Sequence, residues 1–367
     1  MIFLFQQMKT ITLVKEGLSM IGFSVYLNDD LSQTKLDQLV AFKQAGFTGV
    51  FTSLHIPEDD ATKYLPRLKQ LGSACQQLGL RLIADVSATG MKRLGIDIEN
   101  VTAITELGVT GLRIDDGIEM AVVARLSLKL PIALNASTIT AANITALKTN
   151  QANFDHLEAW HNYYPRPETG LDETWLTAKN GWLKAQGFKT MAFVAGDGQR
   201  RGPLAVGLPT LETDRDQLPL AATIRLMKQD QVDDVYVGDP GLTEHSCEQF
   251  KQYFTQQVLL LGVQTDSTWL TDQVWHQRAD VARDVVRLVE GRQQFKQVSP
   301  DRIRARSVGS ITLDNDHYGR YVGELQLVKR PLLADPRVNV IGEVAPADLA
   351  LLPLIDGGQA IKFIQED

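Results

Sequence analysis

The chain has 367 residues, of which 44% are hydrophobic and 22% charged, and this apolar content excludes disorder as the main state. Its length suggests two domains, because one large barrel uses about 250 residues. The net charge of -7 argues against nucleic acid or an anionic membrane as a partner, since both require a basic surface. A small phosphorylated ligand is still possible, because it needs only a few local cations.

The N-terminus and the cysteines carry no targeting or metal signal. The apolar start of residues 1–19 is soon interrupted by polar side chains, so neither a signal peptide nor a membrane-spanning helix is predicted. Because Met20 directly precedes a strand pattern, we expect residues 1–19 to lie outside the fold. Cys75 and Cys247 form no CxxC pair, which is typical of buried thiols in a reducing cytoplasm.

Eight strand-like runs, rich in Val, Ile, Leu and Phe, alternate with amphipathic segments over residues 20–262. The runs are Ile21–Tyr26, Gly49–Ser53, Arg81–Val86, Gly111–Ile114, Ile132–Asn135, His156–Trp160, Thr190–Val194 and Asp234–Val237. Helical patterns cover Ser32–Ala45, Ala61–Leu78 and Thr243–Leu261. Eight such units predict a TIM-type (β/α)8 barrel. A doubly wound sheet is the alternative, but it usually has fewer units, and no GxGxxG follows the first strand.

The pattern changes after about Gln264. We expect a helix over Trp275–Glu290, with its arginines on the polar side. Short β runs separated by Gly, Asn and Pro follow at Ser310–Leu313, Gly323–Val328, Asn339–Val344 and Gln359–Ile364. This pattern predicts a small, mostly antiparallel β-barrel domain over residues 263–367.

The segment GLRIDDG (residues 111–117) is the most pointed candidate for chemistry, because catalysis in such barrels lies at the C-terminal strand ends. Arg113 and Asp115 alternate with apolar residues and so face the same way. An arginine beside a carboxylate keeps it ionised, as a nucleophile or an oxocarbenium stabiliser requires. Asp85 ends the neighbouring strand, and two such carboxylates suit glycoside hydrolysis. A structural Arg–Asp pair is an equal alternative, and Asp116 is expected to cap a helix.

Two long loops supply further candidates. In WHNYYPRPETGLD (residues 160–172), aromatic rings can stack on a sugar or pack the loop, and Arg166 can bind phosphate. In the loop over residues 195–215, glycines surround Arg200 and Arg201, which indicates a phosphate site. Glu212 is a third candidate carboxylate, unless it pairs with Arg215.

Other reaction types receive less support. The six histidines show no metal-ligand spacing, so no metal and no cofactor are expected. The sequence contains no GxSxG motif, so a serine hydrolase triad is not predicted. A Schiff-base aldolase would need a lysine at a strand end, and none of the eight strand ends carries one.

Five motifs together resemble a known family. They are GFSVYL, GLRIDDG, HNYYPRPETGL, RGPLAVGLPTLE and GSITLDNDHYGRYVGELQL. From about Met20 to its end, the chain resembles the 6-phospho-N-acetylmuramidases of bacterial cell-wall recycling. The resemblance implies a TIM-like barrel followed by a cyclophilin-like β domain. It also implies a cytoplasmic enzyme that hydrolyses the disaccharide of N-acetylmuramic acid 6-phosphate and N-acetylglucosamine.

The residue roles follow from chemistry at the predicted strand ends. We expect Asp115 to be the ionised carboxylate near the anomeric carbon and Asp85 or Glu212 its acid partner, although the substrate acetamido group could itself be the nucleophile. Residues expected to bind substrate, including its hydroxyls, acetamido group, phosphate and lactyl carboxylate, are Arg113, Asn135, His161, Asn162, Tyr164, Arg166, Arg200 and Arg201. Residues expected to close the site from the C-terminal domain, unless they only pack a turn, are Asn315, Tyr318 and Arg320.

Two other classes stay open. One is another TIM-barrel phosphosugar enzyme, an isomerase or a lyase. The other is a non-catalytic carbohydrate-binding protein, which would need export. The sequence leaves the oligomeric state open.

Overall fold

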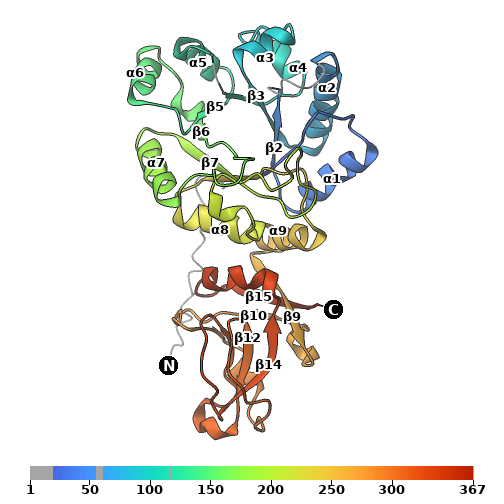
Figure 1. The fold of residues 1–367 in the computed structure, drawn as a ribbon, viewed down its shortest axis with the longest axis vertical. Coiled ribbons are helices and arrows are strands. Elements are labelled where there is room, and N and C mark those ends of the chain that lie inside the picture. The colour runs from blue at the N-terminus through green and yellow to red at the C-terminus, as the bar shows by residue number, and fades with distance from the viewer. Residues whose placement is uncertain (1–19, 55–60, 116, 367) are drawn as a thin grey trace, which may run out of the picture.

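The computed structural model describes residues 20–54, 61–115 and 117–366 and shows a barrel above a second, smaller sheet (Figure 1). The expected extension over residues 1–19 and the expected cap Asp116 lie outside the described residues. No helix in the described ranges is both long and apolar enough to cross a membrane.

Eight parallel strands close into a barrel in the order of the chain, as predicted. The strands are β1 (Ile21–Ser24), β2 (Gly49–Ser53), β3 (Arg81–Val86), β4 (Gly111–Ile114), β5 (Ile132–Asn135), β6 (Leu157–Trp160), β7 (Lys189–Val194) and β8 (Asp234–Val237). The helices around them are α1 (Gln33–Gln44), α2 (Ala61–Leu78), α3 (Ala88–Arg93), α4 (Val101–Glu106), α5 (Met120–Ser127), α6 (Ala141–Thr149), α7 (Glu173–Ala185), α8 (Pro219–Gln229) and α9 (Glu244–Gln256), with the short 3-10 helices η1 (Phe154–His156) and η2 (Glu212–Asp214).

Polar residues begin many of these helices. The side chains of Ser32, Ser87, Asp172 and Thr243 each accept a hydrogen bond from a backbone N–H of the first turn. Several polar residues that follow strands therefore serve as helix caps. Side chains that point into the barrel, or that the loops carry over its mouth, remain as candidates for chemistry.

The barrel interior is layered along its axis. At the bottom, Arg81 and Glu158 form an ion pair at 2.6 Å. Above them lies an apolar layer in which the ring of Tyr236 fills the space beside Gly22 and Gly49, where any Cβ would overlap it. The remaining members of this layer are Phe51, Ile83, Ala133, Trp160, Met191 and Phe193. Because side chains alternate along a strand, the next inward positions form a polar layer at the C-terminal strand ends.

The second sheet has seven strands in the order β10-β15-β9-β14-β12-β13-β11 and is mostly antiparallel. Its strands are β9 (Val258–Thr265), β10 (Val274–His276), β11 (Val285–Leu288), β12 (Ser310–Asp314), β13 (Leu325–Val328), β14 (Val338–Val344) and β15 (Ala360–Gln365). Shorter elements are η3 (Thr268–Leu270), α10 (Gly291–Gln294), η4 (Asp316–Tyr321) and η5 (Pro346–Leu354). A bridge between Gln277 and Leu288 joins the two edge strands, so the sheet curls towards closure.

Two of the predicted helices need correction. The helix expected over Trp275–Glu290 is wrong, because these residues form the two edge strands β10 and β11. Trp275 is fully buried, and its indole N–H donates to Leu270 O at 2.8 Å. The segment Thr243–Leu261 is helical only as far as Gln256, and β9 starts at Val258, within the sheet of the second domain. Val, Leu and Gly favour the strand there.

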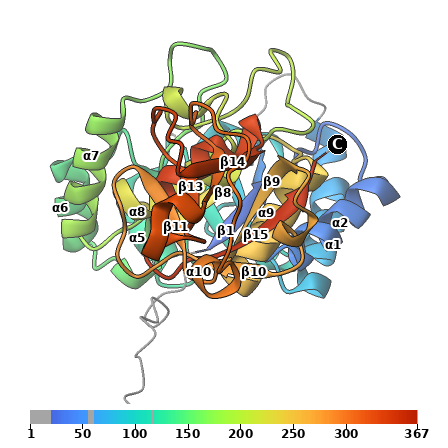
Figure 2. The same cartoon turned by 90° about the horizontal axis from the view of Figure 1, so that it is seen from below.

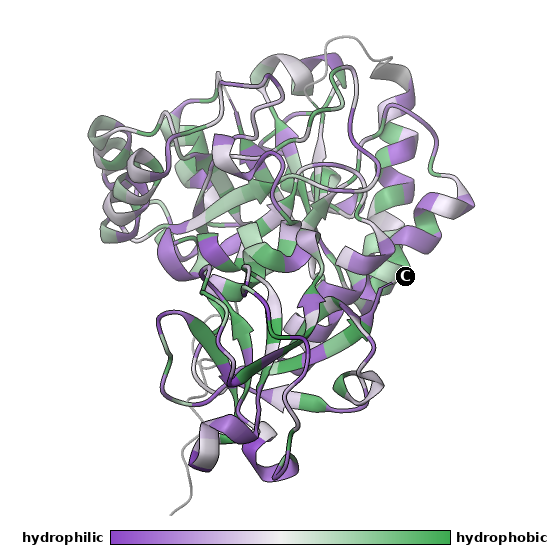
Figure 3. Ribbon diagram, turned by 60° about the horizontal axis from the view of Figure 1, so that its bottom comes forward, coloured by the Kyte–Doolittle hydropathy of each residue, from purple (hydrophilic) through white to green (hydrophobic). Residues whose placement is uncertain are grey.

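The second sheet packs against the outside of the barrel below α8 and α9, through η5 (Figures 1 and 2). Lys228 on α8 forms an ion pair with Asp356, and His245 on α9 lies 3.1 Å from Asp348. In Figure 2 the green and yellow-green loops after β6 and β7 project at the top of the view. Colouring by hydropathy shows apolar strands and mixed helices in both parts (Figure 3).

Candidate active site at the mouth of the barrel

Arg113 is the centre of the polar layer at the barrel mouth. Its Nη1 lies 2.5 Å from Asp85 Oδ1 on β3 and 3.3 Å from Asp115 Oδ1, just beyond β4. Its Nη2 donates to the side-chain oxygen of Asn162, which follows β6. The structure therefore brings together four of the residues expected to form the site. The alternation of Arg113 with Leu112 and Ile114 correctly indicated its inward direction.

The two carboxylates on Arg113 differ in their surroundings. The side chain of Asp85 is 11% exposed, and it also accepts a hydrogen bond from the Ser53 hydroxyl at 3.1 Å. Burial raises the pKa of Asp85 above its usual value, although Arg113 opposes this shift. The side chain of Asp115 is 30% exposed and opens towards solvent. Because both carboxylates touch the same nitrogen, their nearest oxygens lie no more than about 6 Å apart, close enough for two carboxylates to act on one bond.

Asn135 also reaches the mouth, from the end of β5. Its side-chain oxygen accepts from the backbone N–H of Ser137 at 3.0 Å. No partner for its amide nitrogen occurs among the residues that the structure describes. That nitrogen is available to a ligand oxygen.

His161 points away from the mouth. It is fully buried, and its Nε2 donates to Asn180 Oδ1 on α7 at 2.8 Å. Burial lowers the pKa of His161 to about 4, so the ring is neutral near pH 7. Trp160 faces the barrel interior, and the residue after it must face the helix layer. The expectation that His161 binds sugar is therefore corrected.

Arg201 forms a second cationic position in the mouth. The loop after β7 carries its guanidinium over the ring of Tyr26, 3.8 Å from the ring centroid. Its Nη1 donates to the hydroxyl of Tyr163 at 2.8 Å. The Tyr163 ring in turn packs on Phe51 and Phe193 of the apolar layer, at 6.2 and 5.2 Å between centroids. The sequence offered Tyr163 and Tyr164 as rings that could stack on a sugar and named Tyr164 as a binding residue, and the structure places Tyr163 over the barrel interior.

Glu212 serves the loops and not the chemistry. It pairs with Arg215 through both carboxylate oxygens, at 2.8 and 2.7 Å, and accepts from the backbone N–H groups of Glu168 and Gly170. A Cβ at Gly170 would lie 2.6 Å from this carboxylate, so only glycine fits. These donors, Arg215 first, lower the pKa of Glu212 to about 2. An acid this strong holds no proton near neutral pH, so Glu212 is not the acid partner.

The other loop candidates are placed at the rim. Arg200 lies 3.6 Å from the exposed carboxylate of Asp216. Arg166 is exposed, and its carbonyl accepts from Thr169 and Arg215. Tyr164 is half-buried, and its backbone pairs with Pro209.

The prediction that residues of the C-terminal domain close the active site is wrong, because these residues lie at the end of the second sheet far from the barrel. β14 runs antiparallel to β12, and its last residue leads into η5, which packs on the barrel. Asp314 pairs with Val338 at the opposite end of this seven-residue strand, roughly 20 Å away at 3.3 Å per residue. The residues expected to close the site follow Asp314 at this far end: Asn315, Tyr318 and Arg320. They contact their own domain, for example through hydrogen bonds from Asn315 to Asn339 and from Arg320 to Tyr321.

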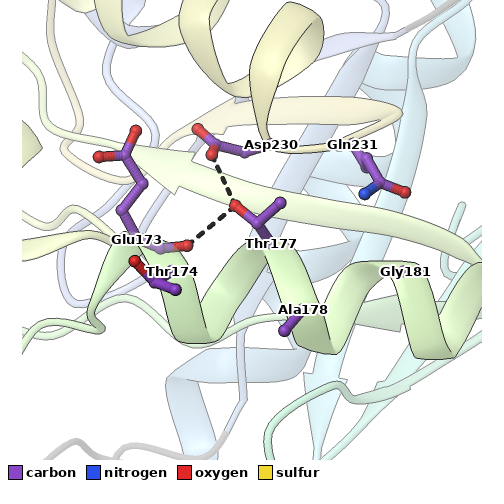
Figure 4. Close-up of a pocket in the computed structure, with 7 residues that line it drawn as sticks. All are labelled: Glu173, Thr174, Thr177, Ala178, Gly181, Asp230 and Gln231. Carbon is purple, nitrogen blue, oxygen red and sulfur yellow. Dashed lines mark hydrogen bonds between the residues drawn. The ribbon is translucent and has the colours of Figure 1, made fainter.

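Two polar clusters lie outside the mouth. A groove of about 590 Å³ lies along α7, beside the end of α8, where Thr177 donates to Asp230 at 2.8 Å (Figure 4). Its two carboxylates, Glu173 and Asp230, both pair with Arg225. At the contact between the domains, His245, Asp348 and Glu366 place ligand-type atoms within 4.8 Å of one another. Asp348 already accepts from Gly262 N and Gln249, as a structural carboxylate does.

Two family models match the chain. The model described as 6-phospho-N-acetylmuramidase, N-terminal, matches residues 21–252, and its C-terminal counterpart matches residues 260–364. A crystal structure of a conserved protein of unknown function from Enterococcus faecalis is 41% identical, with a TM-score of 0.88, over 95% of this chain and 96% of that one. An uncharacterized B. cereus protein is 23% identical, with a TM-score of 0.73, over 94% and 99%, and shows the same fold. No curated protein sequence matches the chain.

Proposed function

Because the chain belongs to the 6-phospho-N-acetylmuramidase family, we propose that it hydrolyses the glycosidic bond between N-acetylmuramic acid 6-phosphate and N-acetylglucosamine. The substrate is a small phosphorylated disaccharide from peptidoglycan recycling. The reaction needs no cofactor in this proposal. We place it in the cytoplasm, where buried free thiols such as Cys75 stay reduced.

One observation carries the proposal: two carboxylates share one buried arginine at the C-terminal mouth of a TIM-type barrel. Asp115 is the more open of the two and lies 3.3 Å from Arg113, so its carboxylate can stabilise positive charge at the anomeric carbon. Asp85 is the buried carboxylate, and its raised pKa makes it the better proton carrier.

The mouth also offers the contacts that a sugar needs. Asn135 and Asn162 present amide groups for hydroxyl and acetamido oxygens. Tyr163 presents an aromatic surface above the apolar layer, as sugar rings commonly require. Asn162 also holds Arg113, so substrate contact and carboxylate position are linked.

A product assay tests this proposal. The purified chain is incubated with the 6-phosphorylated and the unphosphorylated muramyl disaccharide, and products are identified by mass spectrometry. We expect release of N-acetylglucosamine from the phosphorylated substrate. An intact disaccharide, beside an active control enzyme in the same buffer, would refute the proposal and favour a phosphosugar isomerase, a lyase or a binding protein.

A further inference from the structure

The arginines around the barrel mouth differ in what balances their charge. Arg113 contacts two carboxylates, Arg200 lies beside Asp216, and Arg215 pairs with Glu212. Arg201 is different, because its guanidinium contacts only Tyr26 and Tyr163 among the described residues, and neither is a carboxylate. It is half-buried, so its charge is not simply solvated at an open surface. A cation in this setting is suited to an anion supplied by a ligand.

The surroundings of Arg201 hold it in place. Tyr26 lies under its guanidinium, and the Tyr26 hydroxyl donates to Gly238 O at 2.6 Å, which anchors the ring to the end of β8. The backbone N–H of Arg201 donates to Asp239 at 3.0 Å. Asp239 also accepts from the backbone of Gly196 and Leu208, so one buried carboxylate fixes both ends of the loop. An arginine fixed in advance loses little conformational freedom when it binds an anion.

The position of Arg201 relates it to the carboxylate pair. Its loop follows β7, its side-chain partners Tyr26 and Tyr163 follow β1 and β6, and its backbone partner Asp239 follows β8, the strand opposite β4 in the closed barrel. Loops after strands seven and eight commonly form phosphate sites in this fold. The adjacent residues Asn162 and Tyr163 connect the two sides, because Asn162 holds Arg113 while Tyr163 holds Arg201. Two adjacent residues of one loop therefore contact both cations of the mouth.

We propose that Arg201, held between Tyr26 and Tyr163, binds the phosphate monoester of the sugar and makes the site prefer phosphorylated over unphosphorylated ligands. This inference rests on the proposed function for the identity of the sugar. Arg200, although it is adjacent and equally charged, does not carry this preference, because it faces Asp216 at the rim.

Binding measurements test this without turnover. Dissociation constants of N-acetylmuramic acid 6-phosphate and of N-acetylmuramic acid are measured by calorimetry on the full chain. We expect the wild type to prefer the phosphorylated sugar and Arg201→Gln to lose that preference by about 10- to 100-fold, the value of one charged hydrogen-bonded contact. Arg200→Gln is the matched control and should keep the preference. Tyr163→Phe, which removes the hydroxyl that receives the Arg201 hydrogen bond, should weaken it partly.

Several results would overturn the inference. These are a wild type without preference, an Arg201→Gln variant that keeps it, an equal loss in Arg200→Gln, or an equal loss for both sugars. The last result would indicate binding of the lactyl carboxylate. If Arg201→Gln does not fold, Tyr163→Phe decides, and an unchanged preference in that variant counts against the inference. Failure of the disaccharide assay with a preference that depends on Arg201 would refute only the proposed reaction.

Discussion

Replacing Arg113 by methionine removes the cation that two carboxylates share. Asp85 would then be left buried, with the Ser53 hydroxyl as a neutral partner. Breaking a buried ion pair on one side costs about 3–5 kcal/mol, because the remaining charge stays desolvated. That is a large part of the 5–15 kcal/mol typical of a folded domain.

Urea unfolding followed by circular dichroism measures this loss. We expect the midpoint of the barrel transition to fall by about 1 M or more in Arg113→Met. The exposed pair of Arg125 with Glu99 offers a control, and Arg125→Met should cost less than about 1 kcal/mol. The double variant Arg113→Met/Asp85→Asn should recover at least half of the lost stability, because it removes the unpaired charge, but it should stay inactive.

The same variant should show a defined pH dependence. Burial raises the pKa of Asp85 in the folded chain, so the native state holds this proton more tightly than the unfolded state. Stability from this group is therefore present at low pH and is lost as the pH rises through the raised pKa. Without Arg113 the pKa rises further, and the defect should be smaller at about pH 5 than at about pH 8. An Arg113→Met variant as stable as the wild type at both pH values would refute the reasoning.

Three further predictions concern groups outside the carboxylate pair. Glu212→Gln should loosen the loops after β6 and β7 and speed their limited proteolysis at neutral pH, yet leave the shape of the pH–rate profile unchanged. In the wild type, Glu212 protects these loops until the pH falls towards about 2. A shifted pH–rate profile in the variant would show that Glu212 is a catalytic acid. Asp348 raises the pKa of His245, so this contact between the domains should stabilise the wild type more at about pH 6 than at about pH 8. His245→Gln should remove this pH dependence of the melting temperature. An unchanged pH dependence in the variant would contradict the assignment. Burial raises the pKa of Cys75 to about 12, and partial burial raises that of Cys247 to about 11. Cys75 should therefore react with a disulfide reagent only after unfolding, while the half-buried Cys247 reacts slowly in the native chain, and fast modification of native Cys75 would contradict its burial.

The barrel was predictable because its signal is repeated. Each strand is a short apolar run followed by a helix pattern, and the strand over Gly49–Ser53 begins and ends where the sequence predicts. The family resemblance drawn from the motifs is confirmed by models that match both halves of the chain. The edge strands β10 and β11 were missed, because their arginines follow a helical spacing while the buried Trp275 is fixed by long-range packing.

The site was predictable where the alternation of side chains along a strand decides which of them point into the barrel. It placed Arg113, Asp115 and Asp85 together correctly. It could also have excluded His161, because Trp160 before it is an inward core residue. Glu212 connects two loops by accepting hydrogen bonds from backbone N–H groups of the loop after β6, and no local sequence pattern reveals such a contact.

The position of the C-terminal domain could not be derived from spacing. The segment GSITLDNDHYGR has the polar turn residues expected of a binding loop. Only the register of β12 with β14 shows that Asn315 lies at the end of the sheet far from the barrel. Domain orientation is set by the packing of η5 on α8, which is a tertiary property.

Turnover by Asp115→Asn tests the central claim most directly, with the phosphorylated disaccharide as substrate and binding measured in parallel. The substitution keeps size and removes charge from the open carboxylate beside Arg113. We predict a fall in kcat of about 1,000-fold or more with substrate affinity nearly unchanged. Hydrolysis at close to the wild-type rate would contradict the assignment of the barrel mouth as the active site.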